Sequence, residues 1–268
     1  MRHKPKKSLG QNFLTDKNMQ EKVLRTCGFT PLDTVLEIGA GRAEMTRLIV
    51  KQVKKIYALE LDRQLACDLK QDFGGSPSVE VINEDILKFQ ITQKFKKFPG
   101  RIKVFGNIPY YITTPIIEHL LEHRKKIESI YITVQKEVAE RIVAQKQEEA
   151  YGSLSCFLQY YTTPEILLHI KRNCFTPIPG VDSCLLRLVI KRKTELSSAD
   201  SKRLFKIIRA AFNQRRKALK NSLKGILAQG KIAAFLSHRQ IDPLIRPEQL
   251  ALSDFIALIK NKNIQNNY

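Results

Sequence analysis

Short apolar runs alternate with amphipathic stretches through the first two thirds of the chain. Runs rich in Val, Ile and aromatic residues occupy 34–38, 55–59, 79–82, 102–105 and 130–134, and two more follow at 166–170 and 184–190. Between them apolar residues recur at spacings of three and four, as in Leu65, Leu69 and Phe73 after Asp62, which suits a helix N-cap. This alternation predicts an α/β fold, a Rossmann-like, doubly wound, mostly parallel sheet of seven strands.

Helical patterns flank the predicted sheet. Thr15 or Asp16 is expected to cap a helix that carries Met19, Val23 and Cys27 on one stripe. The proline-rich segment 175–180 is interpreted as a stiff link between the last two strands, and residues 204–212 repeat apolar positions at helical spacing. We therefore expect an α/β domain over 1–193 and a smaller, all-helical basic domain over 194–268.

The charge of the chain indicates a class of binding partner. Of 268 residues, 46 are Lys or Arg and 26 are Asp or Glu, which gives a net charge of +20. From Arg187 onward 18 basic and 5 acidic residues leave +13, so most of the excess lies in the predicted helical domain. Such a charge favours a polyanionic partner, most commonly nucleic acid. The 43% apolar content excludes a disordered basic tail.

The lengths of the apolar runs and the spacing of the cysteines bear on where in the cell the protein is expected. No run approaches the roughly 18 apolar residues that a transmembrane helix needs, so we expect no membrane association. The five cysteines are widely spaced and form no C-x-x-C pair. They are expected to be buried thiols in a reducing, cytoplasmic protein, with no metal site.

A glycine turn follows the first predicted strand. Gly39 and Gly41 let the backbone approach a nucleotide-like ligand closely. A dinucleotide fingerprint would place a third small residue at position 44, but Glu44 stands there, and its carboxylate would repel a pyrophosphate. The turn therefore favours a cofactor without phosphate.

Acidic residues follow the next two strands. Glu60, at the end of the second strand, is placed to accept both hydroxyls of a ribose, and Asp85, after the third, to accept an adenine amino group. Helix capping is the alternative for each acid alone. Their joint occurrence after a glycine turn favours ligand binding, whereas Asp62 is expected to be a cap.

The fourth strand leads into Asn107, Ile108, Pro109 and Tyr110. A base amino group is a weak nucleophile, so it needs acceptors that hold its lone pair toward an electrophilic methyl group. The Asn107 side-chain oxygen and the Ile108 carbonyl can supply two acceptors on a turn that Pro109 stiffens. Tyr110 offers a face for a base lifted out of its stack. The alternative interpretation is purely structural: the segment is a turn whose tyrosine packs in the core.

These motifs together resemble the rRNA adenine N6-dimethyltransferase family over nearly the whole chain. The opening segment 7–14 is similar to a family motif whose Asn and Leu contact S-adenosylmethionine. The resemblance thus implies this cofactor and assigns its binding to Asn12, Leu14, Gly39, Gly41, Glu60, Asp85 and Asn107.

Two later segments extend the resemblance. Residues 175–183 resemble the family's F-x-P-x-P-x-V-x-S motif, whose aromatic lies beside the target base, so the implied catalytic set is Asn107, Ile108, Pro109, Tyr110 and Phe175. The entry to the basic domain matches as well. No acid occurs between Lys202 and Arg239 to offset its cations, and the expected RNA-binding residues are Arg209, Arg215, Arg216, Lys217 and Lys220.

The resemblance implies dimethylation of the N6 atoms of two adjacent adenosines near the 3′ end of small-subunit rRNA during ribosome assembly. The expected enzyme is a cytoplasmic monomer that binds this rRNA or a pre-ribosomal small subunit. One alternative is the family branch that methylates large-subunit rRNA and confers macrolide resistance. Segment 214–217 and the F-x-P-x-P spacing favour the small-subunit branch. Another alternative is a non-catalytic assembly or transcription factor on the same scaffold.

Overall fold

The computed structural model describes residues 10–260, so residues 7–9 of the opening motif lie outside the described part. That part divides into two compact units: 10–139 with 163–190, and 140–162 with 191–260. The predicted division after Lys193 falls three residues beyond the end of the first unit, and the second unit also takes in the segment 140–162. The division into an α/β domain that ends at residue 193 and a helical domain that begins at residue 194 stays a prediction.

The first unit is built on a seven-stranded sheet in the order β4-β3-β2-β5-β6-β9-β7. The strands are β2 (Thr34–Ile38), β3 (Lys55–Glu60), β4 (Val79–Asn83), β5 (Ile102–Asn107), β6 (Ile127–Gln135), β7 (Thr162–Ile170) and β9 (Ser183–Ile190). Strands β2 to β6 pair in parallel, and β9 pairs antiparallel to β6. The predicted mostly parallel, doubly wound sheet is confirmed.

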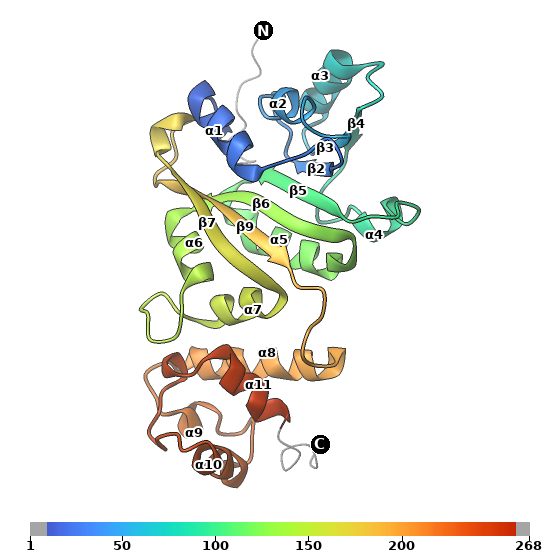
Figure 1. The fold of residues 1–268 in the computed structure, drawn as a ribbon. Helices are drawn as coiled ribbons and strands as arrows, with labels where there is room; N and C mark the ends of the chain where they lie inside the picture. Colours follow the sequence, from blue (N-terminus) through green and yellow to red (C-terminus); the bar gives the residue numbers. More distant parts are fainter. Residues whose placement is uncertain (1–9, 261–268) are drawn as a thin grey trace. The chain divides into compact units, whose positions relative to one another are not determined.

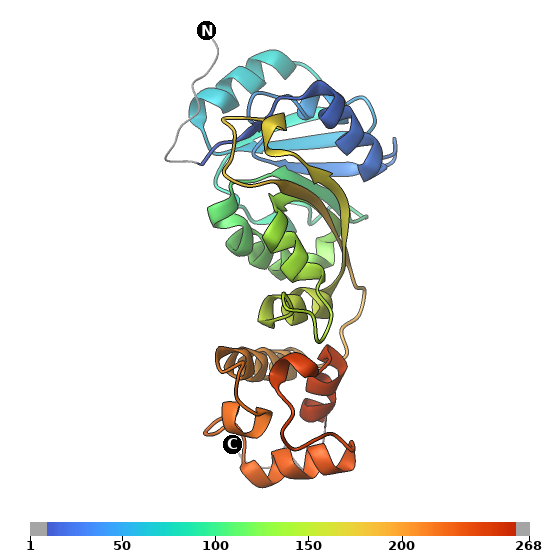
Figure 2. The ribbon, with the colours of Figure 1, turned by 90° about the vertical axis from the view of Figure 1, so that its left-hand side faces the viewer.

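Helices cover both faces of this sheet. Helices α1 (Lys17–Cys27), α2 (Thr46–Ile49) and α3 (Arg63–Phe73) lie on one face, and α5 (Thr113–Glu122) and the start of α6 (Lys136–Val143) lie on the other (Figures 1 and 2). The predicted caps are confirmed: Asp16 accepts a hydrogen bond from Met19 N at 2.7 Å, and Asp62 accepts one from Gln64 N at 2.9 Å. Cys67 in α3 is exposed, so the prediction that all five thiols are buried is wrong for this one.

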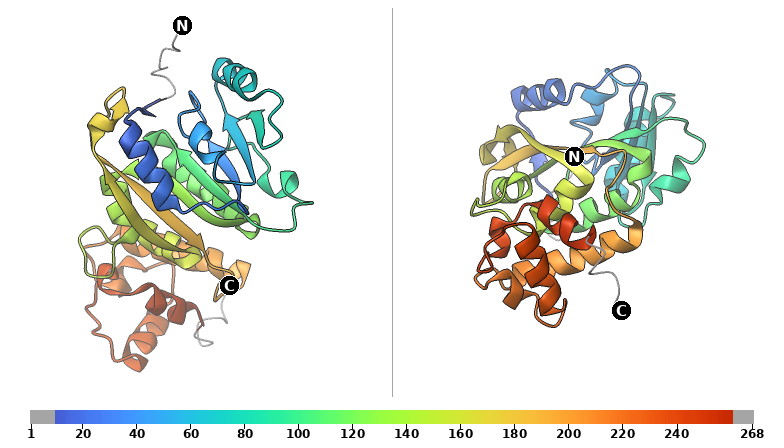
Figure 3. Two further views of the ribbon diagram at one scale, coloured as in Figure 1. Left: turned by 45° about the horizontal axis from the view of Figure 1, so that its top comes forward. Right: turned by 60° about the horizontal axis from the view of Figure 1, so that its bottom comes forward.

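A second, two-stranded sheet was not predicted. Strand β1 (Phe13–Leu14) pairs antiparallel with β8 (Phe175–Thr176), in the segment interpreted as a link. Thr15 N and Asp16 N also donate to the Cys174 carbonyl, at 2.9 and 3.2 Å. Figure 3 shows the loop that carries β8 beside α1. The segment 13–16 is thereby fixed against the loop before β9.

The second unit is helical beyond residue 191. Five helices pack around one shared apolar core. They are α7 (Ser153–Tyr161), α8 (Ser198–Asn213), α9 (Leu219–Ser222), α10 (Gln229–His238) and α11 (Leu252–Lys260). Ser197 caps α8 by accepting from Asp200 N at 3.1 Å, and Leu204, Ile207 and Phe255 are buried in the core. Within 10–260 no helix has the length and apolar character to cross a bilayer.

Candidate functional site

A cavity opens at the carboxyl ends of β2, β3, β4 and β5. This is the edge at which parallel sheets of this kind bind ligands. Nine of the residues predicted from the sequence line it: Asn12, Leu14, Gly39, Gly41, Glu60, Asp85, Asn107, Ile108 and Pro109. Residues separated by almost a hundred positions in the chain are thus brought to one site.

The glycine turn forms one wall of the cavity. Gly39 and Gly41 have positive φ angles of 71° and 58°, which strain other residues. A Cβ on Gly41 would lie 2.9 Å from Phe13 Cε1, so a side chain at 41 would collide with β1. Ala43, two residues after Gly41, also has a positive φ, of 66°.

Glu60 connects this turn to the end of β3. One of its carboxylate oxygens accepts from Gly41 N and the other from Asp62 N, both at 2.8 Å. The side chain is buried, and desolvation raises its pKa. Each carboxylate oxygen keeps a second lone pair for a ligand hydroxyl. Glu60 therefore holds the turn in addition to lining the cavity.

Glu37 is a cavity residue that the sequence analysis missed. It lies in the fully buried strand β2, is 2% exposed, and accepts a hydrogen bond from Thr46 Oγ1 at 2.7 Å. Burial raises the pKa of its carboxyl to about 8. The available signal was a carboxylate inside an apolar strand run, which needs a partner or a function.

The loop after β4 presents Asp85 to the cavity. Asp85 Oδ1 accepts from Leu87 N at 3.0 Å, and its carbonyl accepts from Phe89 N at the same distance. The loop therefore turns tightly around Asp85. One carboxylate oxygen of Asp85 takes part in the turn, which leaves acceptor capacity for a ligand amino group.

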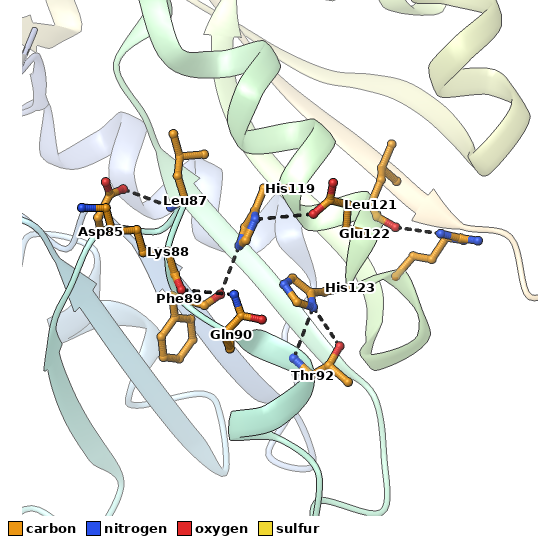
Figure 4. Close-up of polar contacts among 11 residues, drawn as sticks. Asp85, Leu87, Lys88, Phe89, Gln90, Thr92, His119, Leu121, Glu122 and His123 are labelled. Atoms are coloured by element: carbon orange, nitrogen blue, oxygen red, sulfur yellow. Dashed lines mark hydrogen bonds and ion pairs between the residues drawn. The ribbon is translucent and has the colours of Figure 1, made fainter. Parts of the chain in front are cut away.

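Two histidines of α5 and its C-terminal end hold this loop from behind, as Figure 4 shows. His119 Nε2 faces the Phe89 carbonyl at 3.0 Å and must donate, since a carbonyl only accepts. His123 Nδ1 lies 2.8 Å from Thr92 Oγ1. Burial is the main cause that lowers the His123 pKa, followed by the neighbouring His119. The helix that follows the Asn107 turn thus also supports the Asp85 loop.

Asn107 is held in one orientation by the segment that precedes β1. Its Nδ2 donates to the Asn12 carbonyl at 2.8 Å. Because that carbonyl can only accept, the amide must turn its NH₂ group toward Asn12 and its Oδ1 away. Oδ1 is therefore available to accept from a substrate amine, beside the buried residue Ile108.

The two tyrosines after Pro109 occupy different environments. Tyr110 does not line the cavity; its hydroxyl lies 2.6 Å from Ser183 Oγ, and burial raises its pKa. Tyr111, which the sequence analysis did not select, lines the cavity and is 67% exposed. Of the two tyrosines, only Tyr111 borders the cavity, whereas Tyr110 is half-buried beside it.

Comparison with known proteins assigns the chain to a family. The model for "Ribosomal RNA adenine dimethylase" matches residues 2–263. The chain belongs to the ribosomal RNA adenine dimethylase family. The expected family and activity, adenine methylation on rRNA, are confirmed.

Curated relatives and solved structures are similar to this chain over most of its length. "Ribosomal RNA small subunit methyltransferase A" of Streptococcus sanguinis is 38% identical over 94% of this chain and 90% of its own. The same enzyme of Lachnoclostridium phytofermentans is 41% identical over 94% and 89%. A Plasmodium falciparum dimethyladenosine transferase (TM-score 0.77, 23% identity, 94% and 97% covered) shares the fold. The 23S rRNA methyltransferase ErmE superposes with a TM-score of 0.72, at 25% identity over 92% and 98%.

Phe175 is buried in the core of the first unit. Its side chain is 1% exposed and belongs to the apolar cluster that contains Val23, Cys27 and Leu185. Its expected place beside the target base stays a prediction. As part of β8, Phe175 pairs with Leu14 of β1. Phe175 therefore supports the cavity wall from within the core.

The expected RNA-binding residues of this family member lie in the second unit. Arg209, Arg216, Lys217 and Lys220 are exposed. Arg215 instead forms an ion pair with Glu248, which lies in the short 3₁₀ helix Pro247–Gln249. No acid lies between Lys202 and Arg239, but Glu248 reaches Arg215 from outside that stretch.

Proposed function

We propose that this enzyme uses S-adenosylmethionine to dimethylate N6 of two adjacent adenosines near the 3′ end of small-subunit rRNA during ribosome assembly. The names of the 38–41% identical relatives support the small subunit as target. The likeness to ErmE, at 25% identity, is weaker. We further propose that it acts as a cytoplasmic monomer.

The chemistry of the cavity fits S-adenosylmethionine. Its lining carries several carboxyl groups, which oppose a phosphate-bearing cofactor, and these belong to Glu37, Glu44, Glu60, Glu84 and Asp85. When bound, S-adenosylmethionine supplies a methyl group made electrophilic by a sulfonium cation. Glu60 and Asp85 would bind its ribose and adenine, and the cofactor set would be completed by Asn12, Leu14, Gly39, Gly41 and Asn107.

Asn107 and Ile108 orient the substrate nitrogen. Asn107 Oδ1 and the Ile108 carbonyl accept hydrogen bonds from the adenine amino group and turn its lone pair toward the methyl donor. Tyr110 is the proposed stacking face for the flipped base, with Tyr111 beside it at the cavity, and such stacking is worth about 1–3 kcal/mol. The acceleration comes from positioning for an in-line transfer. Tyr110 supports this turn through Ser183.

The observation that carries this proposal is the hydrogen bond from Asn107 Nδ2 to the Asn12 carbonyl, which fixes the acceptor next to the acidic cavity. Its test is incubation with undermethylated small or large ribosomal subunits, followed by mass spectrometry of the rRNA nucleosides. We expect dimethyladenosine in small-subunit rRNA. Product confined to large-subunit rRNA would favour the alternative branch, and product in neither would favour a non-catalytic role.

Asn107→Ala is the matched variant for this experiment. Loss of the acceptor should reduce methyl transfer by about a hundredfold or more, in line with the loss of one positioned polar group in other enzymes. Subunit binding should stay within about twofold of wild type, because Asn107 contributes little to the phosphate contacts that dominate affinity. Unchanged methyl transfer by Asn107→Ala would contradict the mechanism.

A further inference from the structure

Two basic segments of the first unit lie outside the cofactor cavity. One runs from the end of α4 (Ile91–Lys94) to β5, and its cations are Lys94, Lys96, Lys97 and Arg101. The other is the 3₁₀ helix η3 (Arg124–Lys126), in which all three residues are basic. The function proposed above assigns RNA binding to the second unit and gives these segments no role.

Direct contacts join the two segments into one surface, which we call the α4–η3 surface. Lys126 Nζ donates to the Phe98 carbonyl at 2.9 Å, and Arg101 Nε donates to the Ile127 carbonyl at 2.8 Å. The His123–Thr92 contact links the ends of α5 and α4 beside them (Figure 4). These bonds order the backbone of both segments, so their cations form a pre-organised group.

Several charges on the α4–η3 surface are uncompensated. Lys94 is paired with Glu80. Lys96, Lys97 and Lys125 are exposed, and within the described residues none of their ammonium groups forms an ion pair. Three ammonium groups of this kind on an ordered backbone are suited to a phosphate backbone, which gains affinity from counterion release.

We propose that the α4–η3 surface binds phosphates of folded rRNA, at a position remote from the target adenosines. This inference rests on the proposed function, since it assumes an rRNA substrate. The position follows from the sheet: the two segments lead into the amino ends of β5 and β6, whereas Asn107 stands at the carboxyl end of β5. Figure 1 shows α4 at the start of β5.

The length of β5 sets the separation. Its rise from Ile102 to Asn107 is about 17 Å, at roughly 3.3 Å per residue. A nucleotide bound at Asn107 holds its own phosphates well within that distance. The α4–η3 surface must therefore contact phosphates other than those of the target nucleotide itself.

The test is the triple variant Lys96→Gln, Lys97→Gln, Lys125→Gln. Its matched control replaces three exposed lysines carried by α3 and the loop after α2, namely Lys51, Lys54 and Lys70, in the same way. Binding of both variants to undermethylated small subunits is measured from about 50 to 300 mM salt, a range over which phosphate contacts weaken steeply, and their S-adenosylmethionine affinity is measured alongside.

We expect the triple variant to bind subunits about tenfold more weakly at roughly 100 mM salt, with a slope of log K against log[salt] that is shallower by about two, since each phosphate contact contributes about 0.7–0.9. The S-adenosylmethionine affinity should match that of wild type and control. Equal subunit affinities and slopes in the triple variant and the control would overturn the proposal. Failure of the wild type to methylate small subunits would instead reject the proposed function.

Discussion

Replacement of Glu37 by Gln should remove a strong pH dependence of stability. Burial raises the pKa of Glu37 from 4.5 to about 8, so the folded protein keeps a proton that the unfolded chain has lost between these values. The unfolded state then binds fewer protons, and the free energy of unfolding falls as pH rises from about 4.5 to 8. At about 1.36 kcal/mol for each pKa unit, the full loss approaches 5 kcal/mol.

The amide of the Glu37→Gln variant cannot ionise but resembles the protonated carboxyl in shape. The difference in unfolding free energy between this variant and wild type should therefore grow in favour of the variant by about 4 kcal/mol between roughly pH 5 and pH 8.5. Urea unfolding of both proteins at half-unit pH intervals measures it. Titrating groups that do not interact with Glu37 occur in both proteins and cancel in the difference. Parallel stability curves would refute the assignment of a raised pKa to Glu37.

Three further changes test the site. Glu60→Ala removes the proposed ribose-binding carboxylate and the acceptor of Gly41 N. Calorimetry should show S-adenosylmethionine affinity about tenfold weaker or worse, and unchanged affinity would argue against the ribose role. Gly41→Ala brings a Cβ to 2.9 Å from Phe13 at a φ of 58°, so thermal unfolding should reveal a loss of about 1–3 kcal/mol. The double variant Arg216→Gln, Lys217→Gln should weaken subunit binding several-fold, without effect on cofactor affinity; sedimentation of enzyme–subunit mixtures measures the first.

The sheet was predictable because its signal is local. Each long strand contains an apolar run, and β2 occupies the predicted residues 34–38, whereas β6 and β7 extend beyond the runs at 130–134 and 166–170. The positions of Glu60 and Asp85 in the cavity followed from the rule that parallel strands end at one edge. Asp62 was likewise predictable as a cap, because an N-cap bonds to residues only two or three positions away.

The missed features depend on contacts between distant residues. Two-residue strands such as β1 and β8 have no periodicity, so the pairing of Leu14 with Phe175 leaves no trace in either segment alone. The burial of Phe175 follows from that pairing. The ion pair of Arg215 with Glu248 spans 33 residues and was equally hidden. Each of these features depends on residues that are distant in the sequence and meet only in the folded chain.

The bond between Asn12 and Asn107 also sets an order for folding during synthesis. Asn12 leaves the ribosome 95 residues before Asn107, and the strand after it waits longer still for β8. The acceptor amide can gain its orientation only after Asn107 and the parallel strands up to β5 have been translated. A nascent chain that already contains the glycine turn and both acids, but ends before Asn107, therefore lacks the oriented acceptor.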